Sequence, residues 1–310
     1  MSVGILLPGQ GSQHAGMADP WIEHPVGRAV LEEASEALGE DVVALCRDPS
    51  RLADTAAVQP ALVACDVAAA EVLGAFGLRP AVAAGHSVGE YAALVVTGAI
   101  PLAPAIRAVA ERGRAMAEAS RESPGAMTAL IGLGPNDADE VSTVAGRGGV
   151  LAVANLNSPT QTVLSGSRDA VERAEDMARS RGAKAVRLKV AGAFHSPLMR
   201  PAVQPVRAAV ARIPFEPPRV PVVPNGSAEP ETRPSVLRDL LSRHVTSAVR
   251  WERSMRAMAD MGVDLFVETG PGDVLAKLAK RCVQGARAVS VNDPDQAEAL
   301  AAAMEARHAG

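Results

Sequence analysis

Residues 81–90 read AVAAGHSVGE, and this stretch decides the fold class of the chain. A short apolar run that ends at a glycine predicts a buried strand and a tight turn. The residues that follow the glycine-containing pentapeptide GHSVG have the apolar periodicity of a helix. The stretch therefore predicts a strand, a sharp turn and a helix, which is the repeating unit of an α/β fold.

The pentapeptide also fits the pattern G-x-S-x-G, in which a serine projects from a strained turn. Side chains in place of Gly85 and Gly89 would block that turn. The helix after it directs backbone N–H groups toward the serine, where they could hold an oxyanion. Ser87 is therefore a candidate nucleophile, and the alternative is a tight β–α turn in which Ser87 only caps the helix.

Strands and helices alternate outward from this unit along most of the chain. Strands are predicted at residues 3–7, 220–223, 263–268 and 288–291, and helices at residues 57–76, 88–97, 102–119, 234–244, 249–261, 274–281 and 295–307. Residues 125–190 instead have the order β-α-β-β-α-β, which predicts a ferredoxin-like unit. We expect an α/β large domain, residues 1–124 and 191–310, with residues 125–190 as an inserted small domain.

Composition excludes several classes of protein. The chain has 310 residues, a net charge of −4 and only 2% aromatic residues, whereas nucleic-acid binders are usually basic and carry stacking aromatics. Its three cysteines are far apart and fit neither a disulfide framework nor a metal site. The N-terminus lacks a basic leader, and no stretch approaches about 20 uninterrupted apolar residues. We therefore expect a cytoplasmic protein that does not span a membrane.

A serine nucleophile needs a base, and six histidines are available. His195 lies in the apolar, glycine-containing loop AGAFHSP, where the small domain rejoins the large one and could face the cleft between them. The other histidines lie in polar loops, near a helix end, in the tail or directly beside Ser87. His195 is thus the candidate base, and the alternative is a packed loop histidine whose ring bonds only to backbone.

Four separated motifs agree with one family: PGQGSQ at residues 8–13, GHSVGEY at 85–91, AFHS at 193–196 and ETGPG at 268–272. In this order and spacing they resemble the malonyl-CoA:acyl-carrier-protein transacylases of fatty-acid synthesis and the acyltransferase domains of polyketide synthases. The resemblance covers nearly the whole chain. It implies a hydrolase-like large domain with a ferredoxin-like insert, and transfer of malonyl from malonyl-CoA to the phosphopantetheine thiol of an acyl carrier protein.

The resemblance also implies individual roles. Ser87 would form the acyl-enzyme with His195 as base, and the backbone N–H groups of Gln10 and Val88 would form the oxyanion hole. Arg112 matches the family arginine that pairs with the malonyl carboxylate, because a planar guanidinium can bind a carboxylate with two parallel hydrogen bonds. By spacing alone, Arg112 would be one more solvated arginine on a helix.

Three further site residues follow from the same resemblance. Asn157 matches a family asparagine near the site, although a turn residue before a proline is an equal interpretation. Phe194 is the residue that accompanies malonyl in polyketide relatives, since a bulky ring crowds a 2-methyl branch. Arg250 is the candidate whose backbone carbonyl orients the histidine. Ala248 and Arg250 depart from the proline and glutamine of many bacterial members, which leaves that geometry open.

The implied cycle is ping-pong and needs no metal or bound cofactor, because the coenzyme A thioester is a substrate. Basic clusters at residues 179–189 and 277–281 are candidate surfaces for an acidic carrier protein, and we expect a monomer. The rival functions are a free-standing polyketide acyltransferase with another donor, the malonyl-loading subunit of a malonate decarboxylase, a thioesterase or esterase, and a non-catalytic module. A thioesterase or esterase would need an acidic triad partner and would not need Arg112. The intact set of Ser87, His195 and Arg112 argues against a non-catalytic module.

Overall fold

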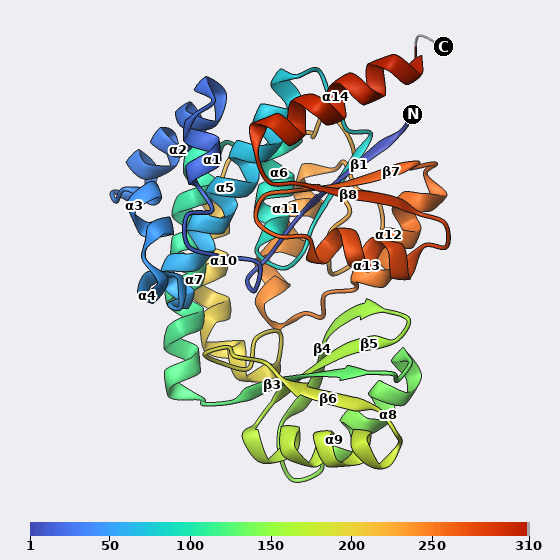
Figure 1. Cartoon of the computed structure of the whole chain (residues 1–310). Helices are drawn as coiled ribbons and strands as arrows, with labels where there is room; N and C mark the ends of the chain where they lie inside the picture. Colours follow the sequence, from blue (N-terminus) through green and yellow to red (C-terminus); the bar gives the residue numbers. More distant parts are fainter. Residues whose placement is uncertain (309–310) are drawn as a thin grey trace.

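The computed structural model describes residues 1–308 and arranges them in two lobes, each built on a four-stranded sheet (Figure 1). The strands are β1 (Val3–Leu7), β2 (Val82–Gly85), β3 (Ala126–Ile131), β4 (Leu151–Ser158), β5 (Gln161–Gly166), β6 (Lys184–Arg187), β7 (Leu265–Thr269) and β8 (Arg287–Val291). The α-helices are α1 (Asp19–Ile22), α2 (Pro25–Leu38), α3 (Val42–Arg47), α4 (Pro49–Leu52), α5 (Thr55–Ala75), α6 (Gly89–Val96), α7 (Leu102–Glu122), α8 (Pro135–Ala145), α9 (Arg168–Ser180), α10 (Arg200–Ala211), α11 (Pro234–Arg243), α12 (Trp251–Asp260), α13 (Val274–Cys282) and α14 (Pro294–His308).

The sheet of the large lobe is parallel, with the strand order β2-β1-β7-β8. Parallel strands need crossover connections, so helices cover both faces and the strands are apolar on both sides. On β1, Val3, Ile5 and Leu7 join the larger apolar core, which includes α5 and α7, while Leu6 joins a second core with α12 and α13. The predicted α/β class with a mainly parallel sheet is confirmed.

Helix α5 is the central helix of the large lobe. By length and composition it is apolar enough to cross a membrane, but 89% of its most apolar stretch is buried inside the protein. It packs along α7 and α2, and its N-terminal end reaches the edge of the sheet where Ser87 lies. Its apolar character is therefore that of a core helix, and the buried Gln59 is a polar exception near its start.

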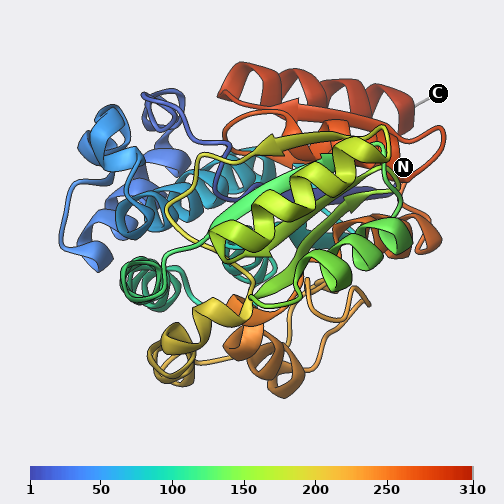
Figure 2. The same cartoon turned by 90° about the horizontal axis from the view of Figure 1, so that it is seen from below.

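The small lobe is antiparallel, with the strand order β4-β5-β3-β6, and its elements lie within residues 126–187. Helices α8 and α9 cover the face that points away from the large lobe (Figures 1 and 2). Along β3, Leu130 packs with those helices, whereas Met127 and Ala129 belong to the core of the large lobe. Since strand side chains alternate, one face of the small sheet closes over the large lobe. This is the ferredoxin-like insert.

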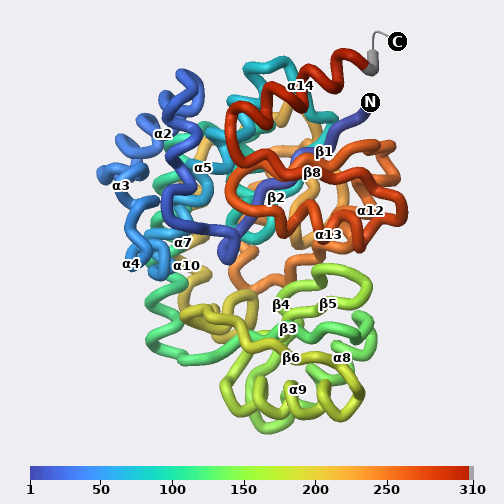
Figure 3. The backbone as a smooth tube through the Cα atoms, in the orientation of Figure 1, coloured from blue at the N-terminus to red at the C-terminus, as the bar shows by residue number. Residues whose placement is uncertain are grey.

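The chain enters the small lobe after α7 and returns through residues 188–196 before α10 (Figure 3). The returning segment carries Phe194 and His195. It therefore runs along the junction of the two lobes, where the sequence analysis expects a cleft.

Two parts of the large lobe differ from the sequence prediction. The strand predicted at residues 220–223 is reduced to isolated bridges from Val222 to Ala83 and to Glu231. Pro221 and Pro224 lack the N–H groups that a longer ladder needs. Helices α1 to α4 and α10 are not predicted by the patterns above, because most of them are one or two turns long and α10 contains two prolines.

Candidate active site

Ser87 occupies the turn between β2 and α6 in a left-handed backbone conformation, with φ of +52°. Such a conformation is strained for a residue with a side chain and persists only where neighbours enforce it. A Cβ on Gly85 would lie 1.9 Å from the carbonyl oxygen of Gly89, and one on Gly89 would lie 2.2 Å from that of Leu7. Both positions therefore require glycine for this turn to form between β2 and α6, against the end of β1.

We expect Gly85→Ala to destabilise the protein by several kcal/mol and to abolish activity, because backbone atoms would have to move by more than an ångström. Thermal unfolding and activity of the purified variant measure both effects. Gly74→Ala is the matched control, since a Cβ there meets only the end of Arg79 at 3.7 Å. Alanine in helix α5 should leave stability unchanged or raise it by about 0.5–1 kcal/mol. An active Gly85→Ala enzyme of unchanged stability would contradict this description of the turn.

His195 lies opposite the serine, with Nε2 2.8 Å from the Ser87 hydroxyl oxygen. Its Nδ1 lies 2.9 Å from the carbonyl oxygen of Ser247 and 3.2 Å from that of His244. Because carbonyl oxygens only accept hydrogen bonds, Nδ1 carries the proton, and Nε2 is free to accept the Ser87 proton. The ring is thus held in the tautomer that a general base needs.

Burial keeps this histidine neutral. His195 is 3% exposed, and desolvation, reinforced by the positive charge of Arg112, lowers its pKa to about 3. The hydrogen bonds to the Ser247 and His244 carbonyls oppose that shift in pKa. His195 is therefore unprotonated at neutral pH and competent as a base.

Arg112 is the most unusual side chain of the site. It is 1% exposed, and its hydrogen bonds go to uncharged groups: Nη1 to the amide oxygen of Gln59 at 2.5 Å and Nη2 to the Ser87 hydroxyl at 3.2 Å. Its Nε has no hydrogen-bond partner among residues 1–308. A buried guanidinium is costly unless an anion meets it, so this one is arranged to receive an anionic ligand beside Ser87.

Close packing of two helices places Arg112 there. It projects from α7, and a Cβ on the adjacent Gly113 would lie 2.8 Å from the carbonyl oxygen of Thr55 at the start of α5. Glycine lets α7 approach α5 closely enough for Arg112 to reach Gln59. Met116, one turn further along α7, lines the same cavity.

A cavity of about 80 Å³ joins these groups. It is lined by Gln10, Gln59, His86, Ser87, Val88, Arg112, Met116, Met127, Asn155, Leu188, Val190, Phe194 and His195. The large lobe provides the reactive groups, while Met127 and Asn155 come from the small sheet. The cavity is thus a small, mostly apolar space with a few convergent polar groups, as ligand sites usually are.

The predicted oxyanion residues both border this cavity. Val88 precedes the first residue of α6, and Gln10 lies in the loop after β1. Neither backbone N–H donates a hydrogen bond to another of the described residues. Two free amides beside a serine, one of them at a helix N-terminus, can stabilise a developing negative charge.

The sequence profile of the acyl transferase domain family matches residues 5–307 of the chain. The malonyl CoA-acyl carrier protein transacylase of Escherichia coli (strain K12) is 42% identical over 306 residues, which cover 97% of this chain and 98% of that protein. The chain belongs to this transacylase family.

Solved structures of the same family agree with the fold. The malonyl CoA-acyl carrier protein transacylase of Coxiella burnetii is 36% identical, with a TM-score of 0.94 over 97% of each chain. A malonyl-transacylase in complex with a type II polyketide synthase acyl-carrier protein is 37% identical, with a TM-score of 0.92 over 96% of this chain and 98% of that one. The fold described above is therefore that of known acyltransferases.

One predicted role in this acyltransferase is wrong. The carbonyl that orients His195 belongs to Ser247, with His244 as second acceptor, and not to Arg250. The Arg250 carbonyl instead accepts hydrogen bonds from the backbone N–H and hydroxyl of Ser254 in the first turn of α12. Ser247 is extended at the end of a short 3₁₀ helix, which turns its carbonyl toward the histidine. Ala248 and Arg250, which depart from the family pattern, follow Ser247 in the sequence and do not provide the carbonyl that accepts from His195.

Asn157, which the family resemblance places near the site, lies behind the cavity lining. The amide oxygen of Asn157 lies 3.0 Å from Nε2 of His86, and its backbone carbonyl accepts from the Cys282 thiol. Asn155, two residues earlier, borders the cavity instead. Irregular pairing between β4 and β5 at this point determines which asparagine faces the site.

Two residues of this acyltransferase site were not predicted. Gln59 binds Arg112, and the Asn225 side chain accepts a hydrogen bond from the backbone N–H of Ser87 at 2.8 Å. Gln59 is hidden in an apolar helix. Asn225 lies in the sequence PNGS, which reads as a simple turn.

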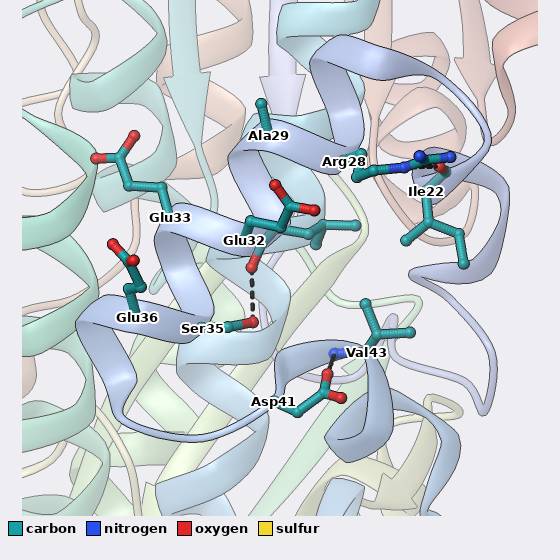
Figure 4. Close-up of a pocket in the computed structure, with 10 residues that line it drawn as sticks. Ile22, Arg28, Ala29, Glu32, Glu33, Ser35, Glu36, Asp41 and Val43 are labelled. Carbon is teal, nitrogen blue, oxygen red and sulfur yellow. Dashed lines mark hydrogen bonds between the residues drawn. The ribbon is translucent and has the colours of Figure 1, made fainter.

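A larger surface groove lies elsewhere. It has a volume of about 750 Å³ and runs between α2 and α3, where Glu32, Glu33, Glu36 and Asp41 surround it (Figure 4). None of the residues assigned to acyl transfer borders it. We therefore place the candidate active site in the smaller cavity, which Ser87 and His195 border.

The basic clusters proposed for carrier binding are partly neutralised. In the first, Arg179, Arg181 and Arg187 form ion pairs with acidic residues of α8 and α9. In the second, Lys277 pairs with Asp273, while Lys280 and Arg281 are exposed on α13. Neither cluster is therefore as positive as its sequence suggests.

Proposed function

We propose that this acyltransferase moves a malonyl group from malonyl-CoA to the phosphopantetheine thiol of an acyl carrier protein. The observation that carries the proposal is Arg112, a buried cation beside the nucleophile with only uncharged hydrogen-bond partners. Its free Nε and neighbouring Nη2 can form two parallel hydrogen bonds with the terminal carboxylate of malonate. An acetyl group offers no such contact.

In the first half of the proposed cycle, Ser87 attacks the thioester carbonyl while His195 accepts its proton at Nε2. The N–H groups of Gln10 and Val88 hold the resulting oxyanion. The carbon–sulfur bond then breaks, and His195 returns the proton to the departing coenzyme A thiolate. The products are free coenzyme A and malonyl-Ser87.

In the second half, the carrier's thiol gives its proton to His195 and attacks the malonyl ester. Ser87 leaves and regains a proton from the histidine. Arg112 holds the carboxylate through both halves. The buried, largely apolar cavity favours a thiol over water, because hydrolysis requires ordered water near the ester.

The cavity also supports a preference for malonyl over methylmalonyl. Phe194 is 6% exposed and borders the cavity, as does the branched Val88. A 2-methyl branch would crowd these side chains, and one methyl group is worth about 1–3 kcal/mol of discrimination.

The remaining parts of the proposal concern setting and partners. We propose a monomer that acts in the cytoplasm, with coenzyme A thioesters as substrates and no resident metal or cofactor. Fatty-acid and polyketide synthesis both use such a transfer. A free-standing polyketide acyltransferase with another donor, and a malonate decarboxylase subunit, remain the alternatives within the same fold.

A thioesterase or esterase is disfavoured by the environment of His195. Its Nδ1 faces two backbone carbonyls, where a hydrolytic triad would place a carboxylate. A neutral ester would also have no anionic group to pair with the buried guanidinium of Arg112.

The test is a transfer assay with malonyl-, methylmalonyl- and acetyl-CoA, and with the carrier in its apo and phosphopantetheinylated forms. Mass spectrometry of the carrier measures transfer, and free acid measures hydrolysis. We expect malonyl transfer to dominate and to require the phosphopantetheinylated carrier. Release of free malonate faster than transfer would indicate a thioesterase, and preference for another donor would favour a polyketide enzyme.

The charges of the site predict an unusual pH profile. In the free enzyme the pKa of His195 is about 3, so kcat/KM for malonyl-CoA should show no acid inflection near the ordinary histidine pKa of about 6.5. Bound malonyl carboxylate offsets the charge of Arg112, which removes one cause of the low pKa. The inflection in kcat should therefore lie at higher pH than that in kcat/KM.

Steady-state rates from about pH 5 to 8 show whether kcat or kcat/KM has an inflection near the ordinary histidine pKa. Arg112→Gln is the informative variant, because removing the positive charge should raise the pKa of free His195. An inflection near pH 6.5 in wild-type kcat/KM that persists in Glu90→Gln, and so does not come from the buried Glu90 carboxyl with its pKa of about 7, would contradict the proposed electrostatics of His195.

A further inference from the structure

Asn225 is the residue that fixes the nucleophile turn from outside. It lies in the loop after Val222, more than 130 residues from Ser87 in sequence, and is 0% exposed. Its side-chain oxygen accepts from the Ser87 backbone N–H at 2.8 Å, and its side-chain nitrogen donates to the Gly85 carbonyl at 2.6 Å. One amide side chain thus bonds to both arms of the strained turn.

The backbone of Asn225 extends this connection in two directions. Its N–H donates to the carboxyl of Glu90 on α6 at 2.8 Å. Its carbonyl accepts from the N–H of Arg250 at 3.2 Å, in the segment that begins with Ser247, the residue that orients His195. Asn225 therefore links the turn that carries the nucleophile to the segment that orients the base.

We propose that Asn225 is a positioning residue that holds the Ser87 turn in register with His195; this proposal rests on the proposed function. The left-handed conformation of Ser87 is strained, so it needs an external restraint. The bond also occupies the Ser87 N–H, which leaves Gln10 and Val88 as the amide donors for the oxyanion.

The chemistry of this position requires one acceptor and one donor on the same short side chain. Asparagine provides both. An aspartate of the same shape provides both only while protonated, because an ionised carboxylate cannot donate to the Gly85 carbonyl. Alanine provides neither and leaves two buried backbone groups without partners.

The charged groups around Asn225 would determine the pKa of an aspartate at this position. The buried Glu90 carboxyl, whose pKa burial raises to about 7, bonds directly to Asn225, and Arg112 of α7 acts on Glu90. The other titratable groups near the turn are His86, which is part of it, and His195, which faces Ser87; Arg250 contacts Asn225 through its backbone N–H. An introduced aspartate would be buried beside Glu90. Burial and repulsion from a charged Glu90 would both raise the pKa of the aspartate.

The experiment compares wild type, Asn225→Ala and Asn225→Asp in the transfer assay from about pH 5.5 to 8, with thermal unfolding for each. We expect Asn225→Ala to lower kcat by about 100-fold, with KM for malonyl-CoA changed by less than about threefold, because Arg112 and the cavity stay intact. Asn225→Asp should retain kcat within about tenfold at the lowest pH and lose it as the pH rises, unlike wild type.

Asn292→Ala is the matched control. Asn292 also accepts a hydrogen bond from a backbone N–H, that of Gly272, but lies outside the active-site cavity. It should keep wild-type kcat and pH profile. If Asn225→Ala fails to fold, the pH profile of Asn225→Asp alone tests the positioning role of Asn225.

Wild-type-like kcat in Asn225→Ala, or a wild-type pH profile in Asn225→Asp, would overturn the proposal. Failure of the proposed function is distinguishable, because it appears in the wild-type assay as a different preferred donor or acceptor. The variants are then compared on that substrate.

Discussion

Ser87→Ala is expected to lower kcat/KM for malonyl transfer by about 10⁴-fold or more, because it removes the atom that carries the acyl group. Binding should change little, since Arg112 and the cavity walls remain in place. Isothermal titration with malonyl-CoA and the transfer assay measure the two effects separately. Loss of the hydroxyl also removes a hydrogen-bond acceptor from Arg112, but the malonyl carboxylate occupies that guanidinium when substrate is bound.

Ser180→Ala is a suitable control, because this serine is exposed at the end of α9 and bonds only to the carbonyl of its own helix. It should retain wild-type activity. If Ser87→Ala kept more than about one per cent of wild-type kcat/KM, the nucleophile would have to be another residue.

Arg112→Ala is expected to lower kcat/KM for malonyl-CoA by about 1,000-fold, the effect of losing two charge-assisted hydrogen bonds in a buried site. Activity with acetyl-CoA should fall far less, because acetyl has no carboxylate to bind. The ratio of the two activities is therefore the informative quantity. Stability should not decrease greatly, since the variant also removes a buried charge that forms no ion pair among residues 1–308.

Arg114→Ala is the matched control for that variant. Arg114 lies two residues further along α7, on the exposed side, where it pairs with Glu111. Surface ion pairs of this kind contribute about 0–1 kcal/mol, so stability and donor preference should remain those of wild type. Equal losses for malonyl and acetyl in Arg112→Ala would contradict the role of Arg112 as carboxylate anchor.

The parts of the site that the sequence predicts are those set by local geometry. Gly85, Ser87 and Gly89 lie within one turn, and the apolar residues on either side of it predict a strand before it and a helix after it. The α/β fold class is predictable for the same reason, because β1, β2 and β7 are short apolar runs that end at or near a glycine. His195 could be narrowed down by its loop and by elimination, but its role needed the family resemblance.

The parts that the sequence does not predict depend on contacts between distant segments. Asn225 meets Ser87 across 138 positions, and Gln59 meets Arg112 across 53. A backbone acceptor such as Ser247 leaves no trace in side-chain chemistry, and the family resemblance therefore points to Arg250 in its place. Burial of Arg112 likewise depends on how closely α7 approaches α5, a property of packing and not of helical spacing.

Covalent capture of the acyl group is the central claim, and intact mass spectrometry tests it most directly. The purified protein is mixed briefly with malonyl-CoA, without a carrier, beside Ser87→Ala, and the adduct is then located by peptide mapping. We predict one malonyl adduct on the wild type, in the peptide that contains Ser87, and none on the variant. A wild type that stays unmodified while malonyl-CoA is consumed, or an adduct that persists in Ser87→Ala, would contradict the proposed mechanism.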